Sequence, residues 1–223
     1  MSIAIAIDGP AGAGKSTIAK AAAKHLGFIY VDTGAMYRAI GLYCLRKEAD
    51  PSDAETVKGL LAEIEVSLAR DDNKNQLVIL NGEDVSGLIR TEAVSMAASR
   101  CSAIPEVRAF LLNLQRDMAK EYNVIMDGRD IGTVVLPDAK VKIFLTASAE
   151  IRARRRYDEL IEKGQDAVYE DVLADVIERD NNDMNRPIAP LKPAADSVLV
   201  DTSELTLEES IALLIKTIEE NSK

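Results

Sequence analysis

The sequence has few of the residues that build zinc sites and disulfide bonds. Among its 223 residues are one histidine, His25, and two cysteines, Cys44 and Cys101. The cysteines lie far apart in the sequence and form no metal-binding or redox motif, so we expect each to be a small core residue. Without a cluster of cysteine and histidine, a zinc site is not expected. The histidine falls late in an expected helix, where a cation would complement the helix dipole.

Long hydrophobic runs are also absent, and basic residues are outnumbered by acidic ones. The first apolar run, residues 3–7, is interrupted by Asp8, too early for a signal peptide, and no segment is long enough to span a bilayer. The formal net charge of −10 disfavours nonspecific binding to nucleic acid or to anionic membranes. We therefore expect a cytoplasmic monomer that binds neither nucleic acid nor membranes and holds any anion with a local basic cluster.

A glycine-rich loop lies between an expected strand and an expected helix. The apolar run 3–7 precedes it, an alanine-rich stretch 17–26 follows it, and its glycines would let consecutive backbone N–H groups face a phosphate at the helix N-terminus. Lys15 could reach the β- and γ-phosphates, and the Ser16 hydroxyl could hold Mg²⁺. An ordinary glycine-rich turn is the alternative, but the spacing and the flanking elements together predict a phosphate-binding loop for a nucleoside triphosphate. The predicted contact residues are Gly9, Pro10, Ala11, Gly12, Ala13, Gly14, Lys15, Ser16 and Thr17.

The apolar pattern predicts an α/β fold. Five apolar stretches alternate with helical stretches, which indicates a five-stranded parallel sheet with helices on both faces. These stretches are residues 3–7, 28–31, 124–126, 141–145 and 197–200. Short strands at 66–69, 76–80 and 83–85, the last two joined by Asn81-Gly82, predict a small antiparallel insertion. Helices are expected at 35–47, from 53, at 91–102, 105–121, 151–163 and 169–183, and from the capping box of Thr206 and Glu209.

Further charged residues follow the core strands or gather in the expected helices 151–163 and 169–183. Thr33 and Arg38, at the start of a helix, could form a second phosphate site, although an N-capped helix with a solvated arginine explains them as well. The arginine-rich stretch would suit a lid that closes on phosphates, whereas a solvated helical face or an intrahelical salt bridge is the plainer explanation. Its members are Arg152, Arg154, Arg155, Arg156, Arg179, Asp183 and Arg186, the last three on one expected helix face.

A phosphate-binding loop by itself does not separate kinases from GTPases and ATPases. The nearest match to a guanine-binding Asn-Lys-x-Asp motif begins at Asn73 but ends in Gln76 and lies in an expected hairpin loop, which argues against a GTPase. A small-molecule kinase must surround two anionic phosphate groups with cations and exclude water, and this chain has residues for both tasks. The alternative is a nucleotide-dependent switch or ATPase that binds a partner protein.

With these residues assembled, the sequence closely resembles the bacterial cytidylate kinases over nearly its whole length. The resemblance rests on the motifs beginning at Ile7, Asp32, Gly82, Ile89, Asp127, Lys142, Glu178 and Ala189. It implies a P-loop kinase fold and transfer of the γ-phosphoryl group of ATP to CMP or dCMP with Mg²⁺. Within the kinase class, UMP or another small acceptor is the alternative substrate. It also implies one domain, 1–223, with a core (about 1–34, 105–150 and 187–223), a monophosphate-binding region with the β insertion (about 35–104) and a helical lid (about 151–186).

The resemblance assigns roles to individual residues by motif position. The acceptor phosphate would be held by Thr33, Arg38, Arg129 and Arg186. The base would be read by Ser99, Arg108 and Asp130, the ribose would meet Arg179 and Asp183, and arginines among Arg152–Arg156 would close over the ATP phosphates. Catalysis would then depend on Lys15, Arg129, Arg155 and Arg186. At position 33 relatives often have serine, and the threonine of this chain keeps the hydroxyl group.

Overall fold

The computed structural model describes residues 2–71 and 76–222, and it divides into two compact units. The first unit comprises Met1–Tyr30 and Tyr122–Lys223, and the second comprises Val31–Glu121. Asn73, Lys74 and Asn75, which belong to the rejected guanine-binding match, lie outside the described residues.

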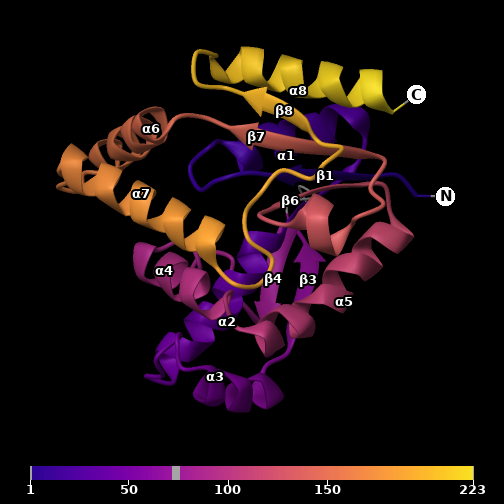
Figure 1. The fold of residues 1–223 in the computed structure, drawn as a ribbon. Coiled ribbons are helices and arrows are strands. Elements are labelled where there is room, and N and C mark those ends of the chain that lie inside the picture. The colour runs from indigo at the N-terminus through magenta and orange to yellow at the C-terminus, as the bar shows by residue number, and fades with distance from the viewer. Residues whose placement is uncertain (1, 72–75, 223) are drawn as a thin grey trace. The chain divides into compact units, whose positions relative to one another are not determined.

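A parallel sheet forms the centre of the first unit (Figure 1). Its strands are β1 (Ala4–Asp8), β2 (Ile29–Asp32), β6 (Val124–Gly128), β7 (Val141–Thr146) and β8 (Val198–Asp201), in the order β2-β6-β1-β7-β8. Ile5 of β1 lies opposite Ile125 on one side and Val141 on the other, both in parallel register. The five apolar stretches of the sequence are thus the five strands, which confirms the predicted sheet.

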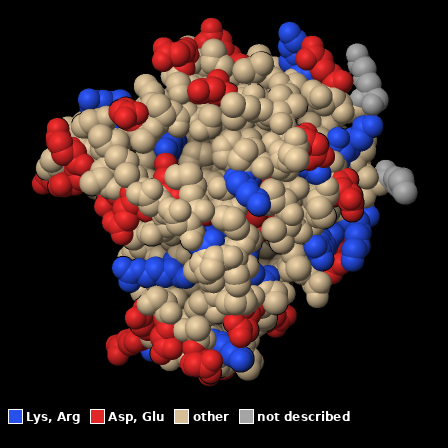
Figure 2. All heavy atoms as spheres, in the orientation of Figure 1, with Lys and Arg blue, Asp and Glu red and all other residues tan. Residues whose placement is uncertain are grey.

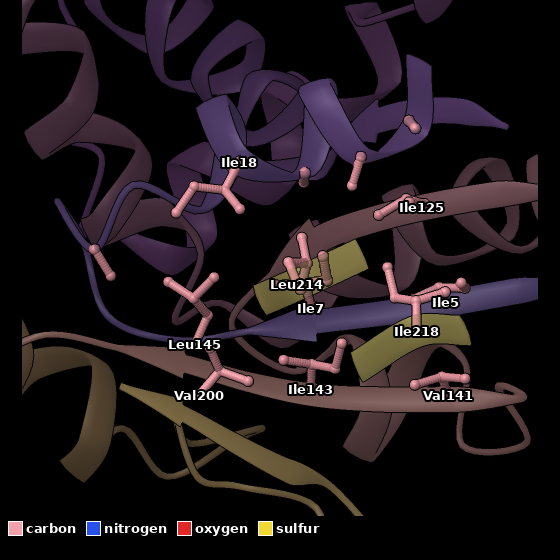
Figure 3. Close-up of a cluster of buried hydrophobic side chains, with 14 residues drawn as sticks. Ile5, Ile7, Ile18, Ile125, Val141, Ile143, Leu145, Val200, Leu214 and Ile218 are labelled. Atoms are coloured by element: carbon pink, nitrogen blue, oxygen red, sulfur yellow. The ribbon is translucent and has the colours of Figure 1, made fainter. Parts of the chain in front are cut away.

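Within its described residues, the first unit contains four α-helices of at least 12 residues, each of which follows a strand or another helix in the chain. They are α1 (Lys15–Leu26), α6 (Ala149–Glu162), α7 (Tyr169–Asn185) and α8 (Leu207–Asn221). Helix α8 begins at the predicted capping box, in which Thr206 and Glu209 bond each other's backbone N–H groups. Helices α1 and α8 pack together, and their apolar faces join the strands in one buried cluster that includes Ile18, Leu214 and Ile143 (Figure 3). Helices α6 and α7 pack against each other.

A single π-helical turn, η2 (Ile131–Val135), follows β6, and the sequence pattern did not predict it. Its backbone is anchored at Asp130, whose carbonyl oxygen accepts the N–H groups of Val134 and Val135 at 2.9 and 3.2 Å. Such turns often mark functional sites, and this one directly follows the predicted substrate residues Arg129 and Asp130.

The second unit contains the predicted antiparallel insertion. Strands β3 (Val66–Arg70), β4 (Gln76–Leu80) and β5 (Glu83–Asp84) pair antiparallel in chain order, and the β4–β5 turn has positive φ at Asn81 (51°) and Gly82 (83°). Its helices are α2 (Thr33–Arg46), α3 (Ala54–Leu60), the 3₁₀ turn η1 (Leu61–Glu63), α4 (Glu92–Cys101) and α5 (Pro105–Glu121).

Aspartate side chains cap two helices of this unit and set the residues at which they begin. Helix α2 begins two residues earlier than expected, since the Asp32 side chain accepts the N–H of Ala35. Helix α3 begins at Ala54, one residue later than expected, because the Asp53 carboxylate accepts N–H groups from the first turn and makes Asp53 the cap.

Helices α2 and α4 pack very closely at Gly41. A Cβ atom at this glycine would lie 2.8 Å from the backbone nitrogen of Ala98 and 3.2 Å from the Cβ of Ala97. Cys44 of α2 and Cys101 of α4 are both fully buried free thiols, which confirms the expectation that they are core residues. The absence of a side chain at Gly41 therefore sets the distance between these two helices.

Figure 2 shows acidic and basic side chains scattered over one face, mostly toward its edge, among a larger area of uncharged residues. In residues 2–71 and 76–222, no helix combines the length and the apolar character needed to cross a bilayer.

Candidate active site

The loop between β1 and α1 leaves the first turn of α1 open to an anion. Gly9 has a φ of 152°, and a Cβ atom there would lie only 1.9 Å from the carbonyl oxygen of Leu145, so no side chain fits. Gly14 is the N-cap of α1 with a φ of 83°, and none of the described side chains caps this helix. The first turn also contains no acidic residue. Its N–H groups are therefore suited to phosphate oxygens.

The Lys15 side chain folds back over the same loop. Its Nζ donates to the carbonyl oxygen of Pro10 at 2.7 Å, and the residue is only 6% exposed. Burial, and next the nearby Arg129 guanidinium, hold the pKa of Lys15 below its ordinary value. A polyphosphate bound here would favour the charged ammonium over the neutral amine.

Ser16 lies beside a carboxylate to which the sequence interpretation gave no role. Its Oγ donates to Oδ2 of Asp127 at 3.0 Å, and the Tyr30 hydroxyl donates to Oδ1 of the same carboxylate at 2.9 Å. A hydroxyl and a carboxylate are oxygen ligands of the kind that Mg²⁺ accepts together with phosphate and water. Within the described residues, no group of three or more acidic, histidine or cysteine side chains is arranged to hold a metal by itself. The pair therefore fits a Mg²⁺ that arrives with a nucleotide, and the signal in the sequence was an acid at the end of a core strand.

Arg129, at the end of β6, pairs with a carboxylate of α7. Its Nε donates to Oδ2 of Asp183 at 2.7 Å, and Asp183 is 5% exposed. Burial would raise the pKa of Asp183, but Arg129, followed by Arg186 and Arg179, outweighs it and holds this pKa below its ordinary value. The structure thus brings together four of the predicted substrate residues of the first unit.

Asp130 belongs to the same network through Arg186. Nη2 of Arg186 lies 3.4 Å from Oδ1 of Asp130, and its Nη1 lies 4.0 Å from Oδ1 of Asp183. Arg186 does not continue the helical face of Arg179 and Asp183, as the spacing predicted, because α7 ends at Asn185 and Arg186 is extended. Its Nε instead donates to the carbonyl oxygen of Ala189 at 2.7 Å, which aims the guanidinium back at the two carboxylates.

In the second unit, Thr33 and Arg38 lie in the first turns of α2, and Asp32 controls both the cap and the arginine. Oδ1 of Asp32 accepts the N–H of Ala35 at 2.9 Å, and its Oδ2 accepts Nη2 of Arg38 at 2.9 Å. The backbone of Asp32 is held in turn by Gln76 of β4, whose side-chain amide bonds both its N–H and its carbonyl oxygen, at 2.9 and 3.2 Å. The helix is therefore N-capped, but Arg38 is paired and is not the solvated arginine of the plainer explanation.

Ser99 and Arg108, the other substrate residues predicted in this unit, are linked through Ser102, the C-cap of α4. Nη1 of Arg108 donates to the carbonyl oxygen of Ser102 at 3.2 Å. The Ser102 hydroxyl in turn donates to the carbonyl oxygen of Ser99 at 2.9 Å. The Arg108 guanidinium also lies 5.6 Å from the centre of the Tyr37 ring. These contacts fix Arg108 beside the turn that carries Ser99.

The arginines of α6 have different partners, so they are not one solvated face. Arg152 is 4% exposed and pairs with Asp180 of α7. Arg154 lies over the rings of Tyr157 and Tyr169, 5.5 and 4.4 Å from their centres.

The two remaining arginines of this stretch, Arg155 and Arg156, also have different partners. Nη2 of Arg155 donates to the carbonyl oxygen of Thr202 at 2.9 Å, and its Nη1 would lie 4.0 Å from a Cβ at Gly14. Arg156 bonds Glu159 one turn along the helix at 3.0 Å. The Arg155 guanidinium therefore lies near Gly14, the N-cap of α1, while Nη1 of Arg152 donates to the carbonyl oxygen of Ala11 in the same loop at 2.9 Å.

The comparisons with known proteins agree with one another. The family model for cytidylate kinase matches residues 5–220. A cytidylate kinase from Carboxydothermus hydrogenoformans is 51% identical over 214 residues, which cover 96% of this chain and 96% of that protein. A cytidylate kinase from Caldanaerobacter subterraneus subsp. tengcongensis is 50% identical over 223 residues, covering 100% of this chain and 97% of that protein. Among solved structures, an uncharacterized protein from Eubacterium ventriosum shares the fold alone, with a TM-score of 0.54 at 14% identity over 98% of this chain and 99% of that chain. The chain belongs to the cytidylate kinase family.

Proposed function

We propose that this protein transfers the γ-phosphoryl group of ATP to CMP and dCMP, forming CDP and dCDP. The observation that carries the proposal is membership of the cytidylate kinase family, with about half of all residues identical to its members over nearly the whole chain. The open first turn of α1, with Lys15 and Ser16 in place, supports a nucleotide as the phosphoryl donor.

On the donor side, residues 9–17 hold the ATP phosphates, and every residue of this loop except Pro10 has a backbone N–H group that can donate to them. Lys15 leaves the Pro10 carbonyl oxygen for the β- and γ-phosphates, where its charge stabilises the transferred group. Ser16 and Asp127 would hold Mg²⁺, and the ion would neutralise charge on the phosphates. Arg155 contacts the phosphates from α6.

On the acceptor side, the arginines exchange carboxylate partners for phosphate. Arg129 and Arg186 now pair with Asp183 and Asp130, and the CMP phosphate would compete for the same guanidinium groups. Release of these carboxylates then frees Asp130 for the amino group of cytosine and Asp183 for the ribose. The remaining acceptor residues that we propose are Thr33, Arg38, Ser99, Arg108 and Arg179.

We further propose that residues 151–186 act as a lid that excludes water, and that residues 35–104 form the monophosphate-binding region. A lid matters because water competes with CMP for the phosphoryl group. The acidic net charge of −10 supports a protein that binds neither nucleic acid nor membranes, and we propose a cytoplasmic monomer.

The test is a coupled assay of ADP release with and without an acceptor. We expect turnover that depends on CMP or dCMP and is much slower with UMP. ADP release that is equally fast without an acceptor would instead indicate an ATPase. A preference for UMP would contradict the assignment of the base-reading residues.

A further inference from the structure

Asp8 makes a contact that the proposed chemistry does not use. It is the last residue of β1, it is 3% exposed, and its two carboxylate oxygens accept the backbone N–H groups of Ile131 and Gly132 at 2.6 and 2.7 Å. These are the first two residues of η2, and the N-cap residue of that turn makes no side-chain cap bond among the described residues. The carboxylate that caps the turn therefore comes from 123 residues earlier in the chain.

This contact lies just beyond the end of the β-sheet pairing. The parallel ladder between β1 and β6 ends where Asp8 lies opposite Gly128. Arg129 and Asp130 follow, outside the ladder, and Ile131 is bonded to the Asp8 carboxylate. The two predicted substrate residues are thus held between the last ladder pair and the Asp8 side chain.

The contact between Asp8 and the turn is also close on the side of Gly132. A Cβ atom at Gly132 would lie 3.3 Å from Oδ2 of Asp8 and 3.3 Å from Cγ and Cδ of Lys142. Even a methyl group would therefore displace the turn, the carboxylate or the lysine stem. A glycine at this position lets the backbone approach the carboxylate closely enough to bond it.

The fold gains little from a negative charge at this position. Burial raises the pKa of Asp8 to about 6, although the two N–H groups oppose the shift; Asp130 raises it further, and Lys15 lowers it. Folding therefore favours the neutral form of a side chain that is ionised at pH 7. A residue that served stability alone would not need this charge.

We propose that Asp8 is a positioning residue for the acceptor, which orients Arg129 and Asp130 by anchoring the turn that follows them. The inference rests on the proposed roles of those two residues in binding CMP. It also links the strand that leads into the donor loop to the segment that binds the acceptor.

The test is Asp8→Asn, which keeps the size of the side chain but replaces one acceptor oxygen with an NH₂ group. The N–H of either Ile131 or Gly132 then faces the NH₂ group in place of an acceptor oxygen, so only one of these two N–H groups keeps its hydrogen bond. We expect the KM for CMP to rise about tenfold, the KM for ATP to change less than about twofold and kcat to fall less than about threefold. The melting temperature should stay the same or rise. The matched control is Asp138→Asn, an exposed aspartate three residues after η2, which should leave all these values unchanged.

An unchanged KM for CMP, or equal rises for CMP and ATP, would overturn the proposal. If Asp8→Asn does not fold, Gly132→Ala answers the same question by pushing the turn away from an intact carboxylate, and the same selective rise is required. Asp130→Asn separates this inference from the proposed function. If that variant leaves CMP binding intact, the assignment of Asp130 is wrong; if it weakens CMP binding while Asp8→Asn does not, the positioning role of Asp8 is wrong.

Discussion

Removal of the Asp180 carboxylate should destabilise the protein far more than removal of an exposed carboxylate on the neighbouring helix. Arg152 is buried between α6 and α7, where it pairs with both oxygens of Asp180. Its Nε and Nη1 also donate to the carbonyl oxygens of Ala147 and Ala11, at 2.8 and 2.9 Å. In Asp180→Ala the guanidinium stays buried without its counter-charge, which typically costs about 3–5 kcal/mol. In a chain of this size that corresponds to a fall in melting temperature of about 6–20 °C.

Urea and thermal unfolding followed by circular dichroism measure this loss, since the chain has no tryptophan for fluorescence. The control is Glu159→Ala, which removes a half-exposed carboxylate that pairs with Arg156 along the same helix and should cost less than about 1 kcal/mol. The double variant Arg152→Met with Asp180→Leu removes both charges and should recover much of the stability that Asp180→Ala loses. If Asp180→Ala costs no more than the control, the buried pair does not hold α7 and the reasoning fails.

Three further predictions concern the site, and one concerns pH. Lys15→Ala should lower kcat about 100-fold or more while the melting temperature stays within a few degrees, and near-normal turnover would exclude its proposed role. Asp130→Ala should lower kcat/KM for CMP far more than for UMP, because a carboxylate accepts from the cytosine amino group; equal losses would mean that Asp130 does not read the base. Gln76→Ala should raise the KM for CMP several-fold, because it releases the backbone of Asp32, and should leave the KM for ATP unchanged, with steady-state kinetics as the check. The folded pKa of Asp8, about 6, lies above its unfolded value, so this group destabilises the fold as pH rises from about 4 to 6. Relative to Asp8→Asn, the wild type should lose about 2 kcal/mol across that interval in urea unfolding, and parallel pH curves would contradict the shift.

The parts of the site that were predictable from the sequence are those set by neighbouring residues. The apolar run before Gly9 and the alanine-rich stretch after it define the loop and both flanking elements within about 25 residues. The antiparallel hairpin was likewise signalled by Asn81-Gly82, since few residue types accept two successive positive φ angles.

The parts that were not predictable depend on residues far apart in the sequence. Spacing along α6 could not show that Arg152 faces a carboxylate 28 residues later while Arg154 lies over the rings of two tyrosines. Nor could it show that Asp8 caps a turn 123 residues away, because each partner alone has an ordinary sequence environment. Side-chain partners of this kind are set by tertiary packing, so a charge pattern that is ambiguous in the sequence becomes specific only in the fold.

The close packing at Gly41 limits how the acceptor specificity of this protein can be redesigned. Any larger residue there would meet the backbone of α4 at Ala98, one residue before Ser99, and would move the helix as a whole. A library that varies Gly41 would therefore change the placement of Ser99 without touching any predicted contact residue. Variants intended to enlarge or reshape the proposed base-binding region are better placed on exposed or half-buried side chains, because the spacing of α2 and α4 leaves no room for an added carbon atom at Gly41.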